Sequence, residues 1–170
     1  MAHNRDIYNL VSYKVQMRLF FFLNLLFSYT TLGFTQTECQ QFANDCEYYS
    51  CVEEIKHCGK HGYLIGFGYK YCRKFSNKEQ NLSGEGQSWI VSVRACLIER
   101  LDNVEPDLSC KQYRQEAIEQ HVPCYTKSGY CDLSKKDKKT IIKMIRGSLW
   151  KPSLFIAGVA VLKHCKDQRQ

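Results

Sequence analysis

Cysteine is the residue type with the widest chemical scope in this chain of 170 residues. Thiolates can bind zinc, attack an electrophilic carbon or pair as disulfides. The chain lacks any C-x-x-C pair of the kind that zinc sites use, although His57, Cys58 and His61 are spaced like a ligand group. An even number of cysteines in an exported chain favours five structural disulfides over a metal site or a cysteine nucleophile. The ten cysteines are Cys39, Cys46, Cys51, Cys58, Cys72, Cys96, Cys110, Cys124, Cys131 and Cys165.

The histidines do not form a catalytic pattern. Those beyond residue 33 are His57, His61, His121 and His164. A zinc-binding helix would carry two histidines four residues apart with a carboxylate residue between them, and no pair here has that carboxylate. A secreted phospholipase would need a His-Asp pair beside adjacent cysteines, and a serine hydrolase a G-x-S-x-G elbow; neither is present. We therefore predict no enzymatic activity, no cofactor and no metal, with a secreted hydrolase as the weakest alternative.

Composition excludes several classes of protein. Hydrophobic residues make up 44% and charged residues 24% of the chain, which is unlike a disordered tail, a collagen or a membrane protein with many spans. The length allows one domain or two small ones. The formal net charge of +7 favours acidic partners only weakly, and without a concentrated basic face it does not indicate nucleic-acid binding.

The N-terminal region resembles a secretory signal peptide. Lys14 and Arg18 precede an apolar run at 19–27, which small and polar residues follow up to Gly33. The run is too short to span a bilayer, although an uncleaved anchor is the alternative, and translation could also start at Met17. We expect residues 1–33 to be removed, leaving 34–170 as one secreted, extracellular domain. Loss of three basic residues and one acidic residue changes 24 basic and 17 acidic residues to 21 and 16, a charge of +5.

The spacing of apolar residues is mostly helical, and no alternation argues for a sheet. Four glycines between Cys58 and Phe75 predict a glycine-jointed loop that leads into a short helix at 71–75. We expect an all-α, disulfide-stapled domain of about four to five short helices. Two of the predicted helices span 39–52 and about 86–102. A third is capped by Ser109 and Gln112 and closed by Pro123, and a fourth begins at Ser134 with Asp137 at the capping-box position. The last spans about 153–165 and opens near Pro152.

Two short motifs concern the surface. Asn81-Leu82-Ser83 is a sequon in a polar stretch and predicts an N-linked glycan at Asn81. The densest basic run contains Lys135, Lys136, Lys138 and Lys139, and such a run is usually only the solvated start of a helix. Its alternative role is a weak contact with a glycosaminoglycan or another anionic surface.

The order and spacing of the cysteines, with the residues around them, resemble the stanniocalcins. The resemblance covers about Cys39 to Cys165. The matching segments are Cys46-x4-Cys51-Val-Glu-Glu-x3-Cys58, Gly62-Tyr63, Tyr71-Cys72-Arg-Lys-Phe75, Gly84-Glu-Gly86-Gln87-Ser-Trp-Ile-Val, Cys96-Leu-Ile, Cys110-Lys-Gln-Tyr113, Gln120-x3-Cys124-Tyr125, Cys131-Asp-Leu and Cys165.

This resemblance implies a secreted helical glycoprotein of hormone type. Stanniocalcins act in calcium and phosphate balance, and some inhibit pappalysin metalloproteinases. The expected partner is then an extracellular receptor or a protease. By cysteine order, the resemblance also implies the bridges Cys39–Cys51, Cys46–Cys72, Cys58–Cys110, Cys96–Cys124 and Cys131–Cys165. The chain lacks the C-terminal cysteine that joins family members covalently, which leaves a non-covalent homodimer open, and the family's own sequon is missing.

Protein recognition would fall to segments between the bridges. The first candidate is the aromatic segment 61–71, with Tyr63, Phe67 and Tyr69, and the second is the basic run 135–139. Exposed tyrosines suit an interface, but the same side chains could fill the core of a small protein. The alternative function is a cysteine-rich secreted effector or defence protein that acts on membranes.

Overall fold

The computed structural model describes residues 36–105 and 107–168. The chain divides between Gly33 and Phe34, and the unit Phe34–Gln170 is the one described here. The expected signal peptide, with the alternative start at Met17, lies outside the described residues.

The described residues are helical and contain no strand, which confirms the all-α prediction. They form seven α-helices rather than four or five: the short helix predicted at 71–75 is present at 70–76, and the segment 121–127, expected as the end of the preceding helix, is a separate helix. In chain order the elements are η1 (Gln36–Phe42), α2 (Glu47–Lys56), η2 (Leu64–Tyr69), α3 (Lys70–Ser76), η3 (Glu79–Asn81), α4 (Gly84–Asp102), α5 (Cys110–Glu119), α6 (His121–Lys127), η4 (Tyr130–Asp132), α7 (Lys135–Ile145), η5 (Arg146–Ser148) and α8 (Pro152–Asp167).

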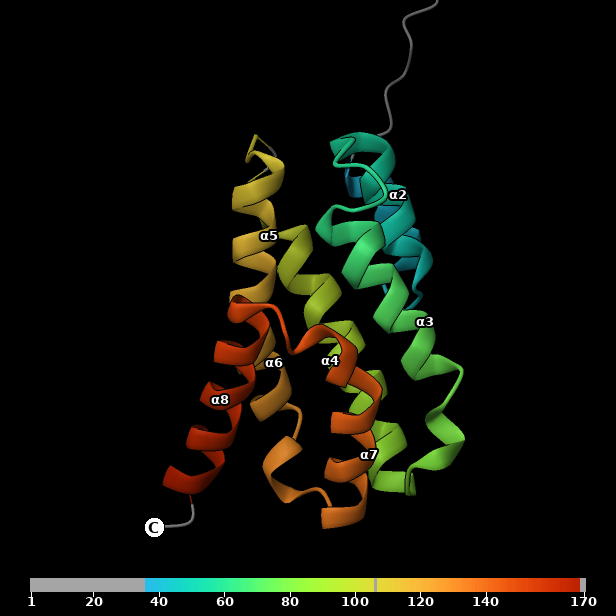
Figure 1. Ribbon diagram of the computed structural model, residues 1–170. Helices are drawn as coiled ribbons and strands as arrows, with labels where there is room; N and C mark the ends of the chain where they lie inside the picture. The colour runs from blue at the N-terminus through green and yellow to red at the C-terminus, as the bar shows by residue number, and fades with distance from the viewer. Residues whose placement is uncertain (1–35, 106, 169–170) are drawn as a thin grey trace, which may run out of the picture. The chain divides into compact units, whose positions relative to one another are not determined.

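The longest helix, α4, links the two hydrophobic cores. In Figure 1 it passes between α5 on one side and α2 and α3 on the other. Ile98 and Leu101, near its C-terminal end, pack with residues of α2, η2 and α5. Trp89 and Val93, nearer its N-terminal end, pack with residues of α6, α7 and α8. The periodicity that predicts a helix at about 86–102 therefore reflects one buried face shared by both cores.

The predicted helix at 39–52 is wrong in one respect, because it is divided in two. The 3-10 helix η1 ends at Phe42 and α2 begins at Glu47. Between them the Asp45 carboxylate accepts a hydrogen bond from the Glu47 backbone N–H at 3.0 Å. This local bond competes with helical bonding and produces a turn that apolar spacing alone does not reveal.

The predicted glycine-jointed loop is also wrong over most of its length. The π-helical segment η2 continues directly into α3, so residues 64–76 are helical throughout. Gly68 is needed there for close packing, since a Cβ atom at this position would lie 2.4 Å from Cδ1 of Tyr49. Of the four glycines in this segment, only Gly59, with a φ of +79°, has the left-handed conformation expected of a turn glycine.

The capping predictions hold, but Pro123 does not close a helix. Ser109 and Gln112 form a complete capping box at the start of α5. That helix ends at Glu119, and Pro123 lies in the first turn of α6. Proline is tolerated there because the first backbone N–H groups of a helix have no partner within it.

Five disulfides connect the helices, and all ten cysteines are paired. Each bridge joins two different elements or their flanking turns. Among the α-helices, α7 contains no cysteine. The pairs are those that the resemblance implies: Cys39–Cys51, Cys46–Cys72, Cys58–Cys110, Cys96–Cys124 and Cys131–Cys165.

A buried carboxylate takes the place of a bridge for α7. Asp137 is 1% exposed, and its oxygens accept hydrogen bonds from the Ser83 backbone N–H at 2.9 Å and the Ser83 hydroxyl at 2.8 Å. The Ser134 hydroxyl donates a third bond at 2.7 Å. Ser83 caps α4 and Ser134 caps α7, so one carboxylate joins the beginnings of two helices. These donors, led by the Ser83 N–H, hold the pKa of Asp137 below its usual value of 3.8.

Replacing Asp137 by Asn is expected to lower the free energy of unfolding by about 2–3 kcal/mol at pH 7, since charge-assisted hydrogen bonds are lost from a buried site. Because the folded-state pKa is depressed, this contribution is complete above the usual value of 3.8 and disappears as the pH falls through the folded-state pKa. Denaturant unfolding followed by circular dichroism at pH 7 and at low pH measures both effects. Asp167→Asn, at an exposed position, is the control, and equal stability of the two variants would contradict this role.

Candidate functional site

The aromatic segment 61–71 is not the exposed loop that the sequence predicts. Tyr63 is only 4% exposed and belongs to the hydrophobic core, so the alternative that tyrosines fill the core is correct for this residue. Phe67 and Tyr69 are half-buried, and the Tyr69 hydroxyl donates a hydrogen bond to the Glu47 carboxylate at 3.1 Å. The segment is mainly structural, and it presents little aromatic surface to a partner.

His121 lies at the centre of an aromatic cluster. Its ring centroid is 5.6 Å from that of Phe67, 5.5 Å from that of Tyr125 and 6.3 Å from that of Tyr63. Its Nδ1 lies 2.8 Å from the Ala117 carbonyl oxygen, so the neutral tautomer with its hydrogen on Nδ1 donates a hydrogen bond to that carbonyl. Burial lowers the pKa of His121 from 6.5 to about 4, so the imidazole is neutral at physiological pH and acts as a core group.

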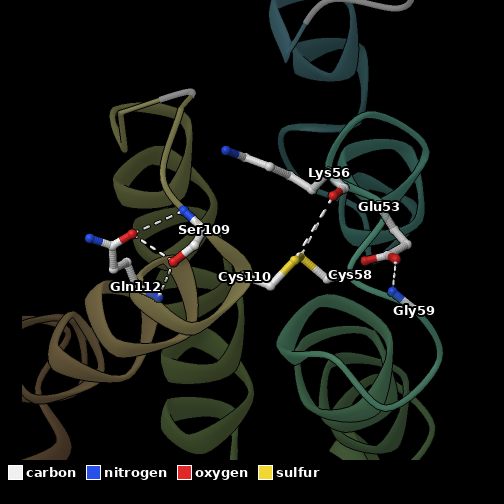
Figure 2. Close-up of a disulfide and its surroundings, with 7 residues drawn as sticks. All are labelled: Glu53, Lys56, Cys58, Gly59, Ser109, Cys110 and Gln112. Carbon is white, nitrogen blue, oxygen red and sulfur yellow. Dashed lines mark hydrogen bonds between the residues drawn. A yellow bond between two sulfur atoms is a disulfide. The ribbon is translucent and has the colours of Figure 1, made fainter.

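The Cys58 sulfur, the candidate ligand beside His57 and His61, is used in a disulfide. The Cys58 sulfur is bonded to Cys110, which connects the turn after α2 with the start of α5 (Figure 2). On one side of this bridge the Glu53 carboxylate accepts a hydrogen bond from the Gly59 backbone N–H, and on the other lies the capping box of α5. No group of three or more metal-ligating side chains gathers anywhere in the described residues.

The basic run divides into two parts. Lys135, Lys136 and Lys139 are exposed on α7. Lys138 instead donates a hydrogen bond to the Cys131 carbonyl at 2.6 Å, and its ammonium lies 5.9 Å from the centroid of the Tyr130 ring. The run is therefore partly structural, and three lysines remain available to an anionic surface.

Asn81 is exposed at the end of η3, as a glycan attachment site requires. The serine of its sequon has a second role in the folded chain. The Ser83 hydroxyl accepts a hydrogen bond from the Gly86 backbone N–H at 3.2 Å and donates one to Asp137. Ser83 is thus a helix cap as well as part of a sequon, and the glycan at Asn81 stays a prediction.

An apolar groove between α7 and α8 is a feature that the sequence analysis missed. It has a volume of about 230 Å³, and its floor includes His121 and Tyr125 of α6. Ile142 and Ile145 of α7 line one wall, and α8 forms the other. Figure 1 shows α6 behind the space between these two helices.

The exposed side of α8 is apolar as well as its buried side, and three of its exposed residues, Phe155, Val159 and Leu162, line the groove. Leu154, Val161 and Cys165 are buried, whereas Phe155, Ile156, Val159 and Leu162 are exposed. The sequence does contain a signal for this, because no charged residue lies between Lys151 and Lys163. A helix that is apolar all round either is fully buried or presents an apolar surface, and here one side has no cover within the described chain.

Comparison with family models, with curated proteins and with solved structures finds no match to this chain. Within the part of the chain that the structure describes, no helix combines the length and the apolar character needed to cross a membrane.

Two substitutions separate the roles of the sequon. Asn81→Gln is expected to remove one glycan and leave the stability of the deglycosylated protein unchanged, because its side chain is exposed. Ser83→Ala should also abolish the glycan, and it should lower the unfolding free energy by about 1–3 kcal/mol, because both the helix cap and the hydrogen bond to Asp137 are lost. Mass spectrometry and chemical denaturation test these expectations. A wild-type chain without a glycan, when secreted from a glycosylating host, would contradict the first.

Stability is expected to fall between pH 7 and pH 5 because of His121. The unfolded chain takes up a proton below pH 6.5, whereas folded His121 does so only near pH 4, so lower pH favours unfolding. One pH unit corresponds to about 1.4 kcal/mol, which gives a loss of about 2 kcal/mol over this range. His121→Phe should remove most of this dependence even if its stability is lower at every pH, and His164→Gln, at an exposed position, should retain it. An unchanged pH dependence in His121→Phe would contradict this assignment.

Proposed function

We propose that this chain is a secreted, stanniocalcin-like regulatory glycoprotein that acts by binding a protein partner and has no catalytic activity. The observation that carries the proposal is the set of five disulfides, whose pairs are those that the resemblance implies. Ten cysteines can pair in roughly nine hundred ways, so agreement at all five bridges is specific support for the shared scaffold.

The surroundings of the reactive side chains support a binding role. His121 is neutral in the core, Asp137 accepts hydrogen bonds from two helix caps, and the cysteines are oxidised. These groups, which could act as a base, an acid or a nucleophile, are engaged in maintaining the fold. Recognition then falls to the surface, where the resemblance implies a receptor or a pappalysin metalloproteinase as the partner.

The number of disulfides supports the proposed extracellular location. Five bridges persist in an oxidising compartment and are rare in the cytosol. Each also restricts the unfolded chain, which typically contributes about 2–4 kcal/mol, although these contributions are not additive. A secreted regulator built in this way retains its binding surface outside the cell without needing a large core.

Intact mass and disulfide mapping of the secreted protein test the scaffold. The expected mass is that of a chain with five bridges, and denaturation without reductant should give a monomer because all ten cysteines pair within the chain. Free thiols or other pairs would contradict the stanniocalcin scaffold.

Titration against a pappalysin metalloproteinase tests the activity. We expect the native protein to reduce cleavage of the proteinase's substrate, with a dissociation constant of about 10⁻⁹ to 10⁻⁷ M, a range that natural antibody–antigen complexes share. Reduced and alkylated protein is the control, since it keeps the sequence but loses the bridges. Correct bridges without binding or inhibition would reject the proteinase as the partner and leave a receptor as the alternative to test by surface binding.

A further inference from the structure

A row of large apolar side chains lies exposed along α8 and the turn before it. Trp150 is 76% exposed, Ile156 66%, and Phe155, Val159 and Leu162 about half. Phe155, Val159 and Leu162 recur at steps of four and three residues, so they share one face of the helix, with Ile156 beside it. We call this row, from Trp150 to Leu162, the α8 strip.

The α8 strip cannot turn inward, because the opposite side of the helix is anchored. Leu154 and Val161 pack in the two hydrophobic cores. Cys165 is buried and bonded to Cys131. Exposed apolar side chains on a helix held so firmly are a stable property of the surface, and a contiguous apolar surface marks a protein or membrane contact.

The surroundings of the strip are basic. Residues 138–166, which include most of α7 and all but the last residue of α8, contain seven Lys or Arg and no Asp or Glu. Lys151 lies four residues before Phe155 and Lys166 four residues after Leu162, so lysines stand at both ends of the strip on the same helical face. Lys163 flanks the strip, Lys143 is exposed on α7, and Arg146 is exposed at the start of η5.

We propose that the α8 strip and its flanking lysines bind the surface of an anionic lipid bilayer. A helix that lies in a membrane interface combines Trp, Phe and aliphatic residues on one face with Lys or Arg beside them, which is the pattern found here. The apolar side chains would enter the boundary between headgroups and acyl chains. The lysine stems would extend along it while their ammonium groups reach the lipid phosphates.

Charge favours this occupant over two others. A second copy of the chain docked on the same face would bring two lysine-rich segments together, and like charges oppose that contact. Protein interfaces are depleted in lysine, whereas six of the seven basic residues here are lysines. A soluble polyanion would match the charge but would leave the apolar strip in water. The inference goes beyond the proposed function and does not depend on it, since it needs no protein partner.

Tryptophan fluorescence provides a direct readout. The chain has two tryptophans, and Trp89 is 3% exposed, so a change in emission on adding vesicles reports mainly on Trp150. With folded protein we expect a blue shift, and binding about tenfold tighter to phosphatidylcholine vesicles that contain about 30% phosphatidylserine than to phosphatidylcholine alone, weakening as salt is added. Failure to bind the phosphatidylserine vesicles, or equal binding to both kinds, would overturn the proposal.

Matched variants, measured by vesicle co-sedimentation, test the two halves of the surface. Trp150→Ser with Ile156→Ser should weaken binding at least about tenfold, while Val91→Ser, an exposed apolar position on α4, should not. Lys163→Glu with Lys166→Glu should also weaken binding. Lys60→Glu with Lys111→Glu changes the net charge equally at exposed positions elsewhere and should weaken binding much less. Circular dichroism verifies that each variant is folded.

Two other results would also overturn the proposal. If Trp150→Ser with Ile156→Ser binds vesicles like the wild type, and only Lys163→Glu with Lys166→Glu loses binding, the surface is a polyanion site and not a membrane contact. If Trp150 becomes buried in a dimer without vesicles, as measured by analytical ultracentrifugation and emission at rising protein concentration, the strip serves a second copy of the chain.

Discussion

The position of α7 depends on the buried carboxylate of Asp137 together with Ile141 and Met144, which pack in one of the two hydrophobic cores. Every other α-helix carries a disulfide cysteine within it or beside one of its ends, whereas α7 has none. Asp137 makes up for this by accepting hydrogen bonds from Ser83, which caps α4 and lies 54 residues earlier in the chain, and from Ser134, which caps α7. The arrangement also contributes to the need for Gly86, where a Cβ atom would lie 2.9 Å from Cβ of Leu82 and 3.1 Å from Cγ of Asp137. Because α7 forms one wall of the apolar groove, the shape of that groove depends on the same interaction.

The disulfides and the hydrogen bonds of Asp137 hold the helices together in addition to the hydrophobic cores. Some apolar side chains can therefore stay at the surface without loss of the fold. In α8, the Cys131–Cys165 bridge and two buried aliphatic side chains hold one side. The other side can therefore remain apolar without unfolding the domain. Its exposure would be a liability in a protein that had no use for it, since such a surface promotes aggregation. The lysines around it reduce that risk and give the surface its charge.

Local signals in the sequence predict the elements well where neighbours in the chain decide the outcome. Ser109 with Gln112, and Ser134 with Asp137, predict two helix starts that the structure contains. Local signals fail where contacts with residues distant in the sequence determine the structure. Gly68 reads as a flexible joint, but the Tyr49 ring that packs against it makes it part of a helix. Tyr63 reads as a surface residue for the same reason: nothing near it in sequence shows that the core encloses it.

The sequence by itself determined the helical class, the helix caps and the number of bridges, because these follow from spacing, side-chain chemistry and an even count of cysteines. Which cysteines meet, and which apolar residues face inward, depended on the tertiary structure. The partners of Asp137 show why, since the capping role within α7 is local but the bond to Ser83 exists only after α4 and α7 have packed together. The exposed face of α8 also depends on tertiary packing. The helix is apolar on all sides, so only the positions of its neighbours determine which face is buried and which is exposed.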